Sequence, residues 1–329
     1  MTDELTYRGQ KYTRHDSSRD NKPIRLDQVF GLNSSIPAFT YVDRSNLDST
    51  FKYFLDSQKH IVIHGASKQG KTVLRKQNLD EEECIKIQCT STTTVKDIYV
   101  EILRQLDTKI ERSLSTERAY GQNASMKLKG GMGPAFSLEG GAGGVRQRKT
   151  TSEYEVIGNE SGNLYFLTEE LLKADKRVVI EDFHYLAENE KKIFAFELKS
   201  FWDSGVFFII VGGWSDENFL QYYNGELTGR VNEIDVRWKD NEISKVITLG
   251  EEALNVKFSE KIRTQLIKDC MQNIGLLQRL AEKLCMRHGV IERQVRAKSL
   301  SNFQNYANIR KKICDEDSRR YGRFCEVVS

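Results

Sequence analysis

The sequence has 329 residues, which is enough for one large domain or two domains of ordinary size. Charged residues make up 29% of it and hydrophobic residues 39%, a globular composition, and a formal net charge of +3 is too small to indicate a nucleic-acid partner by itself. The most apolar run, residues 206–211, is far too short to span a membrane, the first residues lack the apolar core of a signal peptide, and the six cysteines form no C-x-x-C pair. We therefore expect a cytoplasmic protein with no membrane contact, zinc site or disulfide framework.

The first part of the chain leads up to a buried strand. Residues 1–37 mix basic and acidic side chains with few apolar ones, and we expect them to form an N-terminal arm. Within residues 38–55, apolar side chains including Phe51 and Phe54 recur at the spacing of a helix. The apolar run at residues 60–64 then predicts a short buried strand.

The eight residues after this strand, 65–72, spell G-x-x-x-x-G-K-T, the phosphate loop of nucleotide-binding proteins. The glycines let backbone N–H groups and the N-terminus of the next helix surround a β-phosphate. Lys71 would reach the β- and γ-phosphates of ATP, and the Thr72 hydroxyl would ligate Mg²⁺. A chance glycine turn is the alternative, but the flanking strand and helix favour the motif. The nucleotide-binding residues predicted here are Gly65, Ala66, Ser67, Lys68, Gln69, Gly70, Lys71, Thr72 and Val73.

An unusual segment follows a predicted strand at 84–89 and an amphipathic helix at 94–106. Residues 111–160 form a Gly-rich basic insertion: between Ser125 and Thr150 lie seven glycines, five basic residues and a single acid. Alternation around a Gly-Pro turn predicts a small hairpin there. Two interpretations stay open for this segment, a surface insertion with no dedicated partner and a contact for DNA or RNA.

A second phosphate-site signature follows a predicted helix at 162–173. Four mainly hydrophobic residues of a predicted strand lead into Glu181 and Asp182. Glu181 would hold Mg²⁺ together with Thr72, and Asp182 would orient or deprotonate the attacking water. An acidic pair at a strand end is a weak signal alone and a strong one with a phosphate loop upstream. For His64 and His184, which flank these motifs, we favour the interpretation of hydrogen-bonded histidines in or near the core.

Two further strands are predicted at 206–211 and 232–236. Because the five predicted strands alternate with helices, they indicate a parallel sheet covered on both faces, with ligand at the carboxyl ends of the strands. From residue 243 the pattern becomes helical, over 243–250, 259–273, 275–288 and 292–312, and predicts an all-helical second domain. Residues 286–313 carry seven Lys or Arg residues and one Glu, which is either a solvated helix face or a contact for nucleic acid.

The order of these motifs resembles the AAA+ ATPases, in the branch shared by ORC/Cdc6-like proteins and STAND signalling ATPases, and among these a bacterial stand-alone ATPase. The resemblance implies an α/β fold: a five-stranded parallel P-loop (AAA+, ASCE) sheet with helices on both faces, followed by a helical lid domain. It implies an arm at 1–37, a nucleotide-binding domain at 38–240 that contains the insertion, and a lid with basic C-terminal helices at 241–329. Tyr41-Val42-Asp43-Arg44 is similar to the box with which this family holds adenine, so Arg44 is a predicted nucleotide contact.

The resemblance also assigns three positions outside the main motifs. Ser215 lies where a polar residue, sensor 1, reads the γ-phosphate, and Arg279 lies near the sensor-2 arginine, although Gln278 occupies the usual position. Arg230 lies where family members place an arginine finger that reaches a neighbouring subunit's nucleotide. The acidic pair is Glu-Asp instead of the usual Asp-Glu or Asp-Asp, so the resemblance implies an ATPase whose hydrolysis is slow or stimulated by a partner.

Three functions remain open at this stage. The first is an oligomeric switch or motor subunit, a homo-oligomer in which ATP bound between protomers orders a ring or filament. The second is a nucleic-acid-binding ATPase that resembles an initiator, a helicase loader or a transposition regulator and contacts DNA or RNA through residues 125–150 and 286–313. The third is a subunit of a bacterial anti-phage defence cassette, which implies an effector protein as partner.

Overall fold

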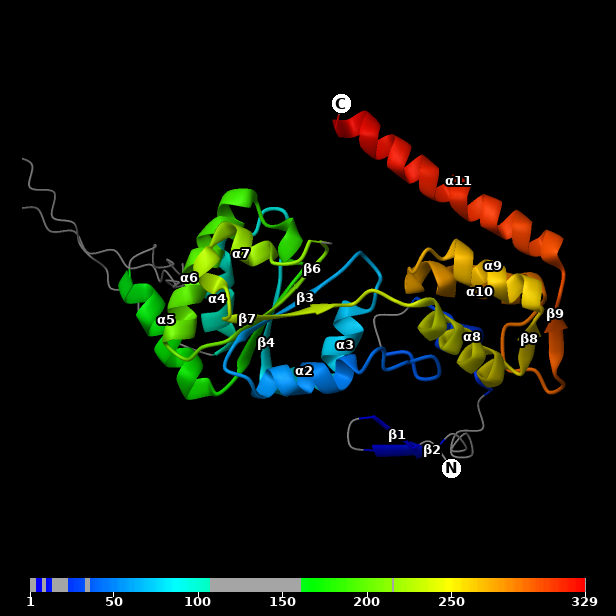
Figure 1. Cartoon of the computed structure of the whole chain (residues 1–329), viewed down its shortest axis with the longest axis horizontal. Helices are drawn as coiled ribbons and strands as arrows, with labels where there is room; N and C mark the ends of the chain where they lie inside the picture. The colour runs from blue at the N-terminus through cyan, green and yellow to red at the C-terminus, as the bar shows by residue number, and fades with distance from the viewer. Residues whose placement is uncertain are drawn as a thin grey trace, which may run out of the picture.

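The computed structural model describes residues 4–7, 10–13, 23–32, 36–106, 161–214 and 216–328. They form an α/β domain and a helical domain, which lie side by side in Figure 1. The Gly-rich basic insertion predicted at 111–160, with its hairpin, lies outside the described residues. Among the described residues, the structure contains no helix that is both long and apolar enough to cross a membrane.

A five-stranded parallel sheet forms the centre of the α/β domain. Its strands are β3 (His60–His64), β4 (Cys84–Gln88), β5 (Arg177–Glu181), β6 (Phe208–Gly212) and β7 (Val231–Asp235). Their order across the sheet is β4-β5-β6-β3-β7, and every neighbouring pair is parallel. All five predicted strands and their parallel arrangement are confirmed. The segments after β3 and β5 leave the same edge of the sheet, so this topology brings the phosphate loop and the acidic pair together.

Helices cover both faces of this sheet because its strands alternate large apolar side chains between the two sides. Val62, Ile180 and Ile210 pack on one face, where the helices contribute Ile98, Leu167 and Leu198 among others. Ile61, Ile63 and Val179 point to the other face, against Phe51 and Leu74. The first layer contains α4 (Val95–Gln105), α5 (Ser161–Ala174), α6 (Glu188–Asp203) and α7 (Phe219–Tyr223), and the second contains α2 (Leu47–Asp56) and α3 (Lys71–Asn78).

The helical domain has its own apolar core, built from both ends of the described chain. Its helices are α8 (Asp240–Leu254), α9 (Glu260–Asp269), α10 (Ile274–Arg287) and α11 (Phe303–Val328). The prediction of an all-helical domain is wrong in one respect, because β8 (Val256–Phe258) and β9 (Lys298–Leu300) form a parallel pair. The last helix begins at Phe303 instead of Glu292, since Gln294 and Lys298 direct their backbone N–H groups to Leu254 and Asn255.

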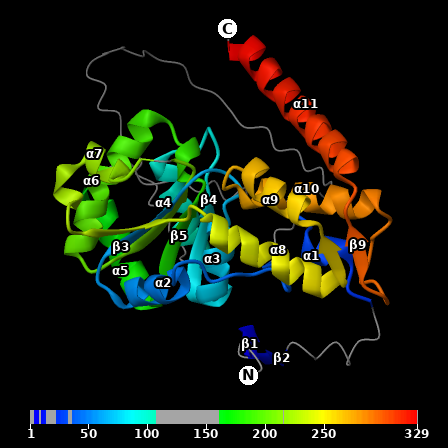
Figure 2. The ribbon, with the colours of Figure 1, turned by 45° about the vertical axis from the view of Figure 1, so that its right-hand side comes forward.

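The N-terminal segment contributes to the same core. After an antiparallel hairpin, β1 (Glu4–Tyr7) and β2 (Gln10–Thr13), the short helix α1 (Leu26–Val29) lies beside α8 in Figure 2. Phe30 is fully buried on Gly250, where a Cβ atom would approach the Phe30 ring to 2.1 Å. Residues 26–30 are therefore part of the helical domain's core, whereas we expected an arm. The domain boundaries at 37 and 240 stay predictions.

Candidate functional site

The phosphate loop connects β3 to α3 through a backbone that alternates between ordinary and left-handed conformations. Lys68 has φ +62° and Gly70 has φ +86°, and such alternation is typical of anion-binding loops. Gly65 combines φ +138° with close packing, since a Cβ atom there would lie 2.8 Å from Val236 Cγ2. A side chain at this position would push the loop away from the sheet, so glycine is required.

The lysine of this loop is folded back onto the loop's own backbone. Lys71 Nζ donates to the carbonyl oxygens of Gly65 at 2.8 Å and Ala66 at 2.7 Å. Burial lowers the pKa of Lys71, while the nearby charges of Asp182 and Glu181 oppose that shift. The ammonium group is thus held over the loop with carbonyl partners that phosphate oxygens could replace.

The two predicted acids have different surroundings. Glu181 is buried, and its carboxylate accepts from Arg75 Nε at 3.0 Å and from Thr72 Oγ1 at 3.2 Å. Arg75 is itself fully buried and also donates to Glu81 at 2.8 Å. The pKa of Arg75 is raised, because its hydrogen bond to Glu81 and the charge of Glu181 outweigh the effect of burial, which lowers it. The structure therefore joins Thr72 and Glu181, the predicted metal ligands, and adds a buried arginine behind them.

Asp182 is more open to solvent than Glu181. Its backbone is left-handed, with φ +56°, and its side chain is 42% exposed, against 4% for that of Glu181. Asp182 Oδ2 accepts from Gln88 Nε2 at 2.6 Å, and the residue lines the cavity described next. One acid is thus fixed within the protein and the other faces the space where substrate would bind.

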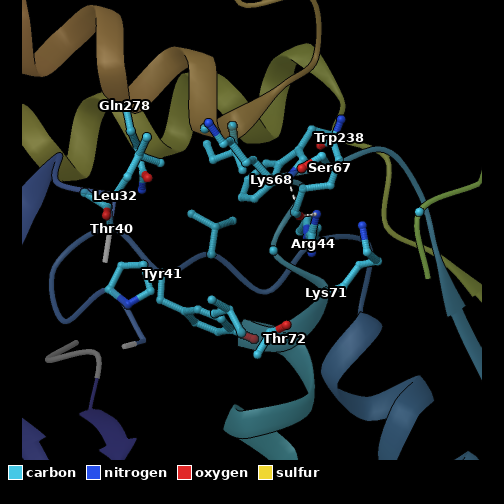
Figure 3. A pocket seen from close by; sticks show the side chains of 18 of the residues that line it. Leu32, Thr40, Tyr41, Arg44, Ser67, Lys68, Lys71, Thr72, Trp238 and Gln278 are labelled. Atoms are coloured by element: carbon cyan, nitrogen blue, oxygen red, sulfur yellow. Dashed lines mark hydrogen bonds between the residues drawn. The ribbon is translucent and has the colours of Figure 1, made fainter. Parts of the chain in front are cut away.

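A cavity of about 570 Å³ lies above the phosphate loop, between the α/β domain and the helical domain. This volume is within the range of small-molecule sites. In Figure 3 its walls come from the phosphate loop, the N-terminal segment and the overlying helices of the second domain, from which Gln278 projects near Leu32 and Thr40. The lining residues include Leu32, Thr40, Tyr41, Arg44, Lys68, Lys71, Thr72, Asp182, His184, Trp238, Ile274 and Gln278.

Arg44, the predicted adenine contact, supports the loop from the side. Its Nη1 donates to Gln69 O at 2.8 Å and Val236 O at 2.6 Å, and its guanidinium stacks on the Trp238 ring at 4.3 Å. Trp238 Nε1 donates to the same Gln69 oxygen at 3.1 Å. Burial lowers the pKa of Arg44 to about 10. Arg44 lines the cavity, but in this structure its hydrogen bonds go to the protein backbone.

The helical domain contacts the phosphate loop directly through the start of α10. Gly275 N donates to Lys68 O at 3.2 Å, and Asn273 Nδ2 donates to Ser67 O at 3.3 Å. A Cβ atom at Gly275 would lie 2.6 Å from Lys68 Cβ, so the contact depends on glycine. The conformation of the loop and the position of the second domain are therefore linked.

One of the remaining predicted contacts, Arg279, lies away from the cavity wall. Arg279 points to α11, where it forms ion pairs with Glu316 and Asp317, and the neighbouring Gln278 lines the cavity in its place. Arg279 and Gln278 face different surroundings because consecutive side chains along a helix point about 100° apart. Ser215 lies outside the described residues.

Arg230, the predicted arginine finger, lies just before β7. This is the amino-terminal end of the parallel strands, whereas the phosphate loop lies at their carboxyl end. Arg230 stacks on the Trp202 ring at 4.6 Å and donates to the backbone oxygen of Glu226. Because Val231 pairs with His60, Arg230 lies level with residue 59, six residues or about 20 Å along the strand direction from Gly65 of its own loop. It is therefore placed away from the nucleotide site of its own chain.

A family model described as "AAA domain" matches residues 55–215, which include the phosphate loop and the acidic pair. This part of the chain has the P-loop AAA+ fold. The match and the strand order together confirm the resemblance to AAA+ ATPases that the sequence indicates. The AAA+ family and fold support nucleotide binding at the loop.

Solved structures show the same fold at low sequence identity. The Walker-type ATPase PABY2304 of Pyrococcus abyssi superposes with a TM-score of 0.51 at 15% identity, over 90% of this chain and 79% of that one. The Orc1 protein of Aeropyrum pernix, solved in complex with DNA, superposes with a TM-score of 0.50 at 10% identity, over 88% of this chain and 69% of that one. No curated protein sequence matches. The likeness establishes the AAA+ fold across both domains.

Sequence reasoning missed three contributors to this site. The contact of Arg75 with Glu181 could have been predicted from the sequence, because a cation one turn into the P-loop helix lies close to the acidic strand. Trp238 had no local signal, since its contact with Gln69 joins residues 169 positions apart. His184, for which we favoured a hydrogen-bonded histidine in or near the core, is hydrogen-bonded but also lines the cavity.

Proposed function

We propose that the chain is an ATPase that binds ATP with Mg²⁺ in the cavity between its AAA+ sheet and its helical lid, and that hydrolysis changes the position of the lid. One observation carries this proposal. The cavity is lined by Lys71, Thr72 and Asp182 of the AAA+ motifs, and α10 of the helical domain touches the phosphate loop at its edge.

The residues present fit a magnesium ion. The Thr72 hydroxyl and the Glu181 carboxylate, 3.2 Å apart, are hard oxygen donors, and Mg²⁺ prefers a few such ligands completed by water and phosphate oxygens. When bound, the ion would neutralise charge on the phosphates. Lys71 exchanges its carbonyl partners for phosphate oxygens, and Asp182 orients the attacking water from the open side of the cavity.

The proposal is tested by ATP binding and phosphate release with purified protein. We expect Lys71→Ala to remove most ATP binding because it deletes the cation that faces the phosphates. Lys52→Ala is a matched control, since Lys52 is an exposed lysine of α2. Wild-type protein that binds ATP no better than Lys71→Ala would refute the proposal.

We further propose that the chain works as an oligomeric switch or motor in which Arg230 completes a neighbour's nucleotide site. The support is its position at the amino-terminal end of β7, away from the nucleotide site of its own chain. To reach the neighbour's site, Arg230 would have to leave Trp202. Light scattering with and without ATP tests this. A strict monomer with ATP, unaffected by Arg230→Ala, would contradict it.

A nucleic-acid-binding ATPase remains the second candidate. Arg287, Arg296, Lys311 and Lys312 are exposed within the basic stretch 286–313, and the Aeropyrum pernix structure is an AAA+ fold bound to DNA. Against it, Arg293 is already bonded to the backbone of Glu252 and Ala253. Because phosphate contacts weaken steeply with salt, binding to DNA and RNA should be measured from low to physiological salt. Lack of affinity at low salt would exclude this function.

The anti-phage role, with an effector protein as partner, rests on motif order alone and stays a prediction. Plaque counts on cells that carry the gene with its neighbours, compared with the Lys71→Ala variant, would test it. Equal plaque counts would count against that role and leave the ATPase proposal unaffected.

A further inference from the structure

The segment that follows β6 lines the cavity at Gly213. The strand ends at Gly212, and neither Gly213 nor Trp214, the described residues directly after it, offers a small polar side chain. Trp214 turns inward, where it stacks on Phe219 at 4.6 Å and leaves no room for a Cβ atom at Gly212. Gly213 and Trp214 therefore offer no side-chain hydrogen bond to a phosphate in the cavity, which directs attention to the polar side chains that lie beside them.

His184 lies beside this end of β6, in the short turn after Asp182. Gly213 N donates to His184 Nδ1 at 3.1 Å, and a Cβ atom at Gly213 would lie only 3.3 Å from the imidazole ring. The ring also packs against that of Tyr185 in a tilted arrangement, with centroids 4.2 Å apart. Glycine at 213 thus lets the imidazole close over the end of β6, and two contacts fix its orientation.

This hydrogen bond determines which ring nitrogen carries the proton. A nitrogen that accepts from a backbone N–H has no proton of its own, so the neutral ring is protonated on Nε2 and can donate from there. Burial lowers the pKa of His184, which keeps the ring neutral. His184 lines the cavity together with Lys71, Asp182 and Gly213. The arrangement presents a fixed N–H donor beside the residues that would surround the terminal phosphate.

We propose that His184, in the turn between β5 and α6, donates a hydrogen bond from Nε2 to the γ-phosphate of bound ATP. The inference rests on the proposed ATPase function. Because Gly213 holds the other ring nitrogen, the contact also links the state of the nucleotide to β6 in the centre of the sheet.

The test compares two nucleotides that differ in the γ-phosphate. Dissociation constants for ADP and for the non-hydrolysable imido analogue of ATP are measured by calorimetry with magnesium, for wild type and His184→Ala. A hydrogen bond to a charged group predicts that affinity for the triphosphate falls about tenfold or more, while ADP affinity changes less than about twofold. His288→Ala, a histidine at the far end of α10, is the matched control and should change neither value.

A second variant guards against a general loss of structure. His184→Gln keeps a side chain that can accept from Gly213 N–H and donate into the cavity, so it should recover part of the triphosphate affinity. If His184→Ala weakens ADP and the analogue equally, or weakens neither, the inference is wrong while the ATPase proposal stands. If wild type binds neither nucleotide, both are wrong.

Discussion

Glu181 and Asp182 are adjacent in sequence, but the structure gives them different surroundings. Glu181 is enclosed by Thr72 and Arg75, whereas Asp182 faces the cavity. We expect Asp182→Asn to bind ATP within about threefold of wild type. It should hydrolyse ATP at least about 100-fold more slowly, because a general base contributes at least that factor. Single-turnover phosphate release, measured beside equilibrium binding, checks both numbers.

Glu181→Gln provides the comparison for this prediction. It should weaken magnesium-dependent binding, because it removes the charge next to Thr72, and should raise the concentration of Mg²⁺ needed for half-maximal activity. If Glu181→Gln binds ATP normally without hydrolysis while Asp182→Asn remains active, the two roles are the reverse of those assigned here.

Arg75 stabilises the folded protein through its buried ion pair with Glu181. It is fully buried, and its partner Glu181 is only 3% exposed, so removing one leaves the other charge buried without its partner. We expect Arg75→Met to lower the free energy of unfolding by about 3–5 kcal/mol. Urea denaturation gives this value. The double variant Arg75→Met with Glu181→Gln should recover part of the loss, and strictly additive effects would show that the pair is not coupled.

At the level of elements, the contact between α10 and the phosphate loop is the feature most open to test. A methyl group at Gly275 would meet Lys68 Cβ at 2.6 Å and force the two apart. We expect Gly275→Ala to weaken ATP binding about tenfold while the helix itself becomes slightly more favourable, since alanine has the higher helix propensity. Calorimetric titration with ATP measures the affinity.

The control for this prediction is Gly225→Ala. A Cβ atom there meets nothing within 4 Å, so neither affinity nor stability should change by much. Equal ATP affinity for wild type and Gly275→Ala would show that the loop binds nucleotide independently of the lid.

Local patterns predicted most of the α/β domain, because each strand and helix carries its own signal. The five strands follow from apolar runs, and the phosphate loop from its glycines and Lys71. The pair of β8 and β9 was missed because each strand has only three residues and they lie about forty residues apart. In the site, Trp238 and the direction of Arg279 depend on contacts between distant segments. A one-residue error in helix register is enough to move a side chain from the cavity to another surface.

For the whole molecule, we expect the burial of His60 to lower the free energy of unfolding in acid. It is fully buried where β3 meets α6 and β6: one ring nitrogen bonds to Leu198 O at 2.9 Å, and Nδ1 accepts from Phe208 N at 3.0 Å. Burial lowers the pKa of His60 to about 4 from its ordinary value of 6.5. The unfolded chain therefore takes up this proton as pH falls below 6.5, while the folded protein does so only near pH 4.

The contribution of His60 to the free energy of unfolding should accordingly be largest above pH 6.5. It should fall by about 3 kcal/mol by pH 4, because each pKa unit corresponds to about 1.4 kcal/mol. Urea denaturation across this range measures the slope for wild type and for His60→Gln. The variant should be less stable at neutral pH but should lose less stability on acidification. Identical slopes would mean that His60 titrates normally in the folded protein.

The packing of α1 in the helical domain has a mechanical consequence. Because α1 belongs to that domain and α2 to the α/β domain, the chain crosses between the two bodies twice, through residues 36–46 and again through residues 236–239. Arg44 Nη1 bonds to Val236 O at 2.6 Å, and Ser45 Oγ bonds to Glu242 at 2.8 Å, so the two crossings are fastened to each other. Two domains joined by adjacent crossings move most easily by rotation about the axis through those crossings. We therefore expect the helical domain to rotate about this axis relative to the α/β domain. A protease cut in one crossing alone should leave the two domains attached through the other.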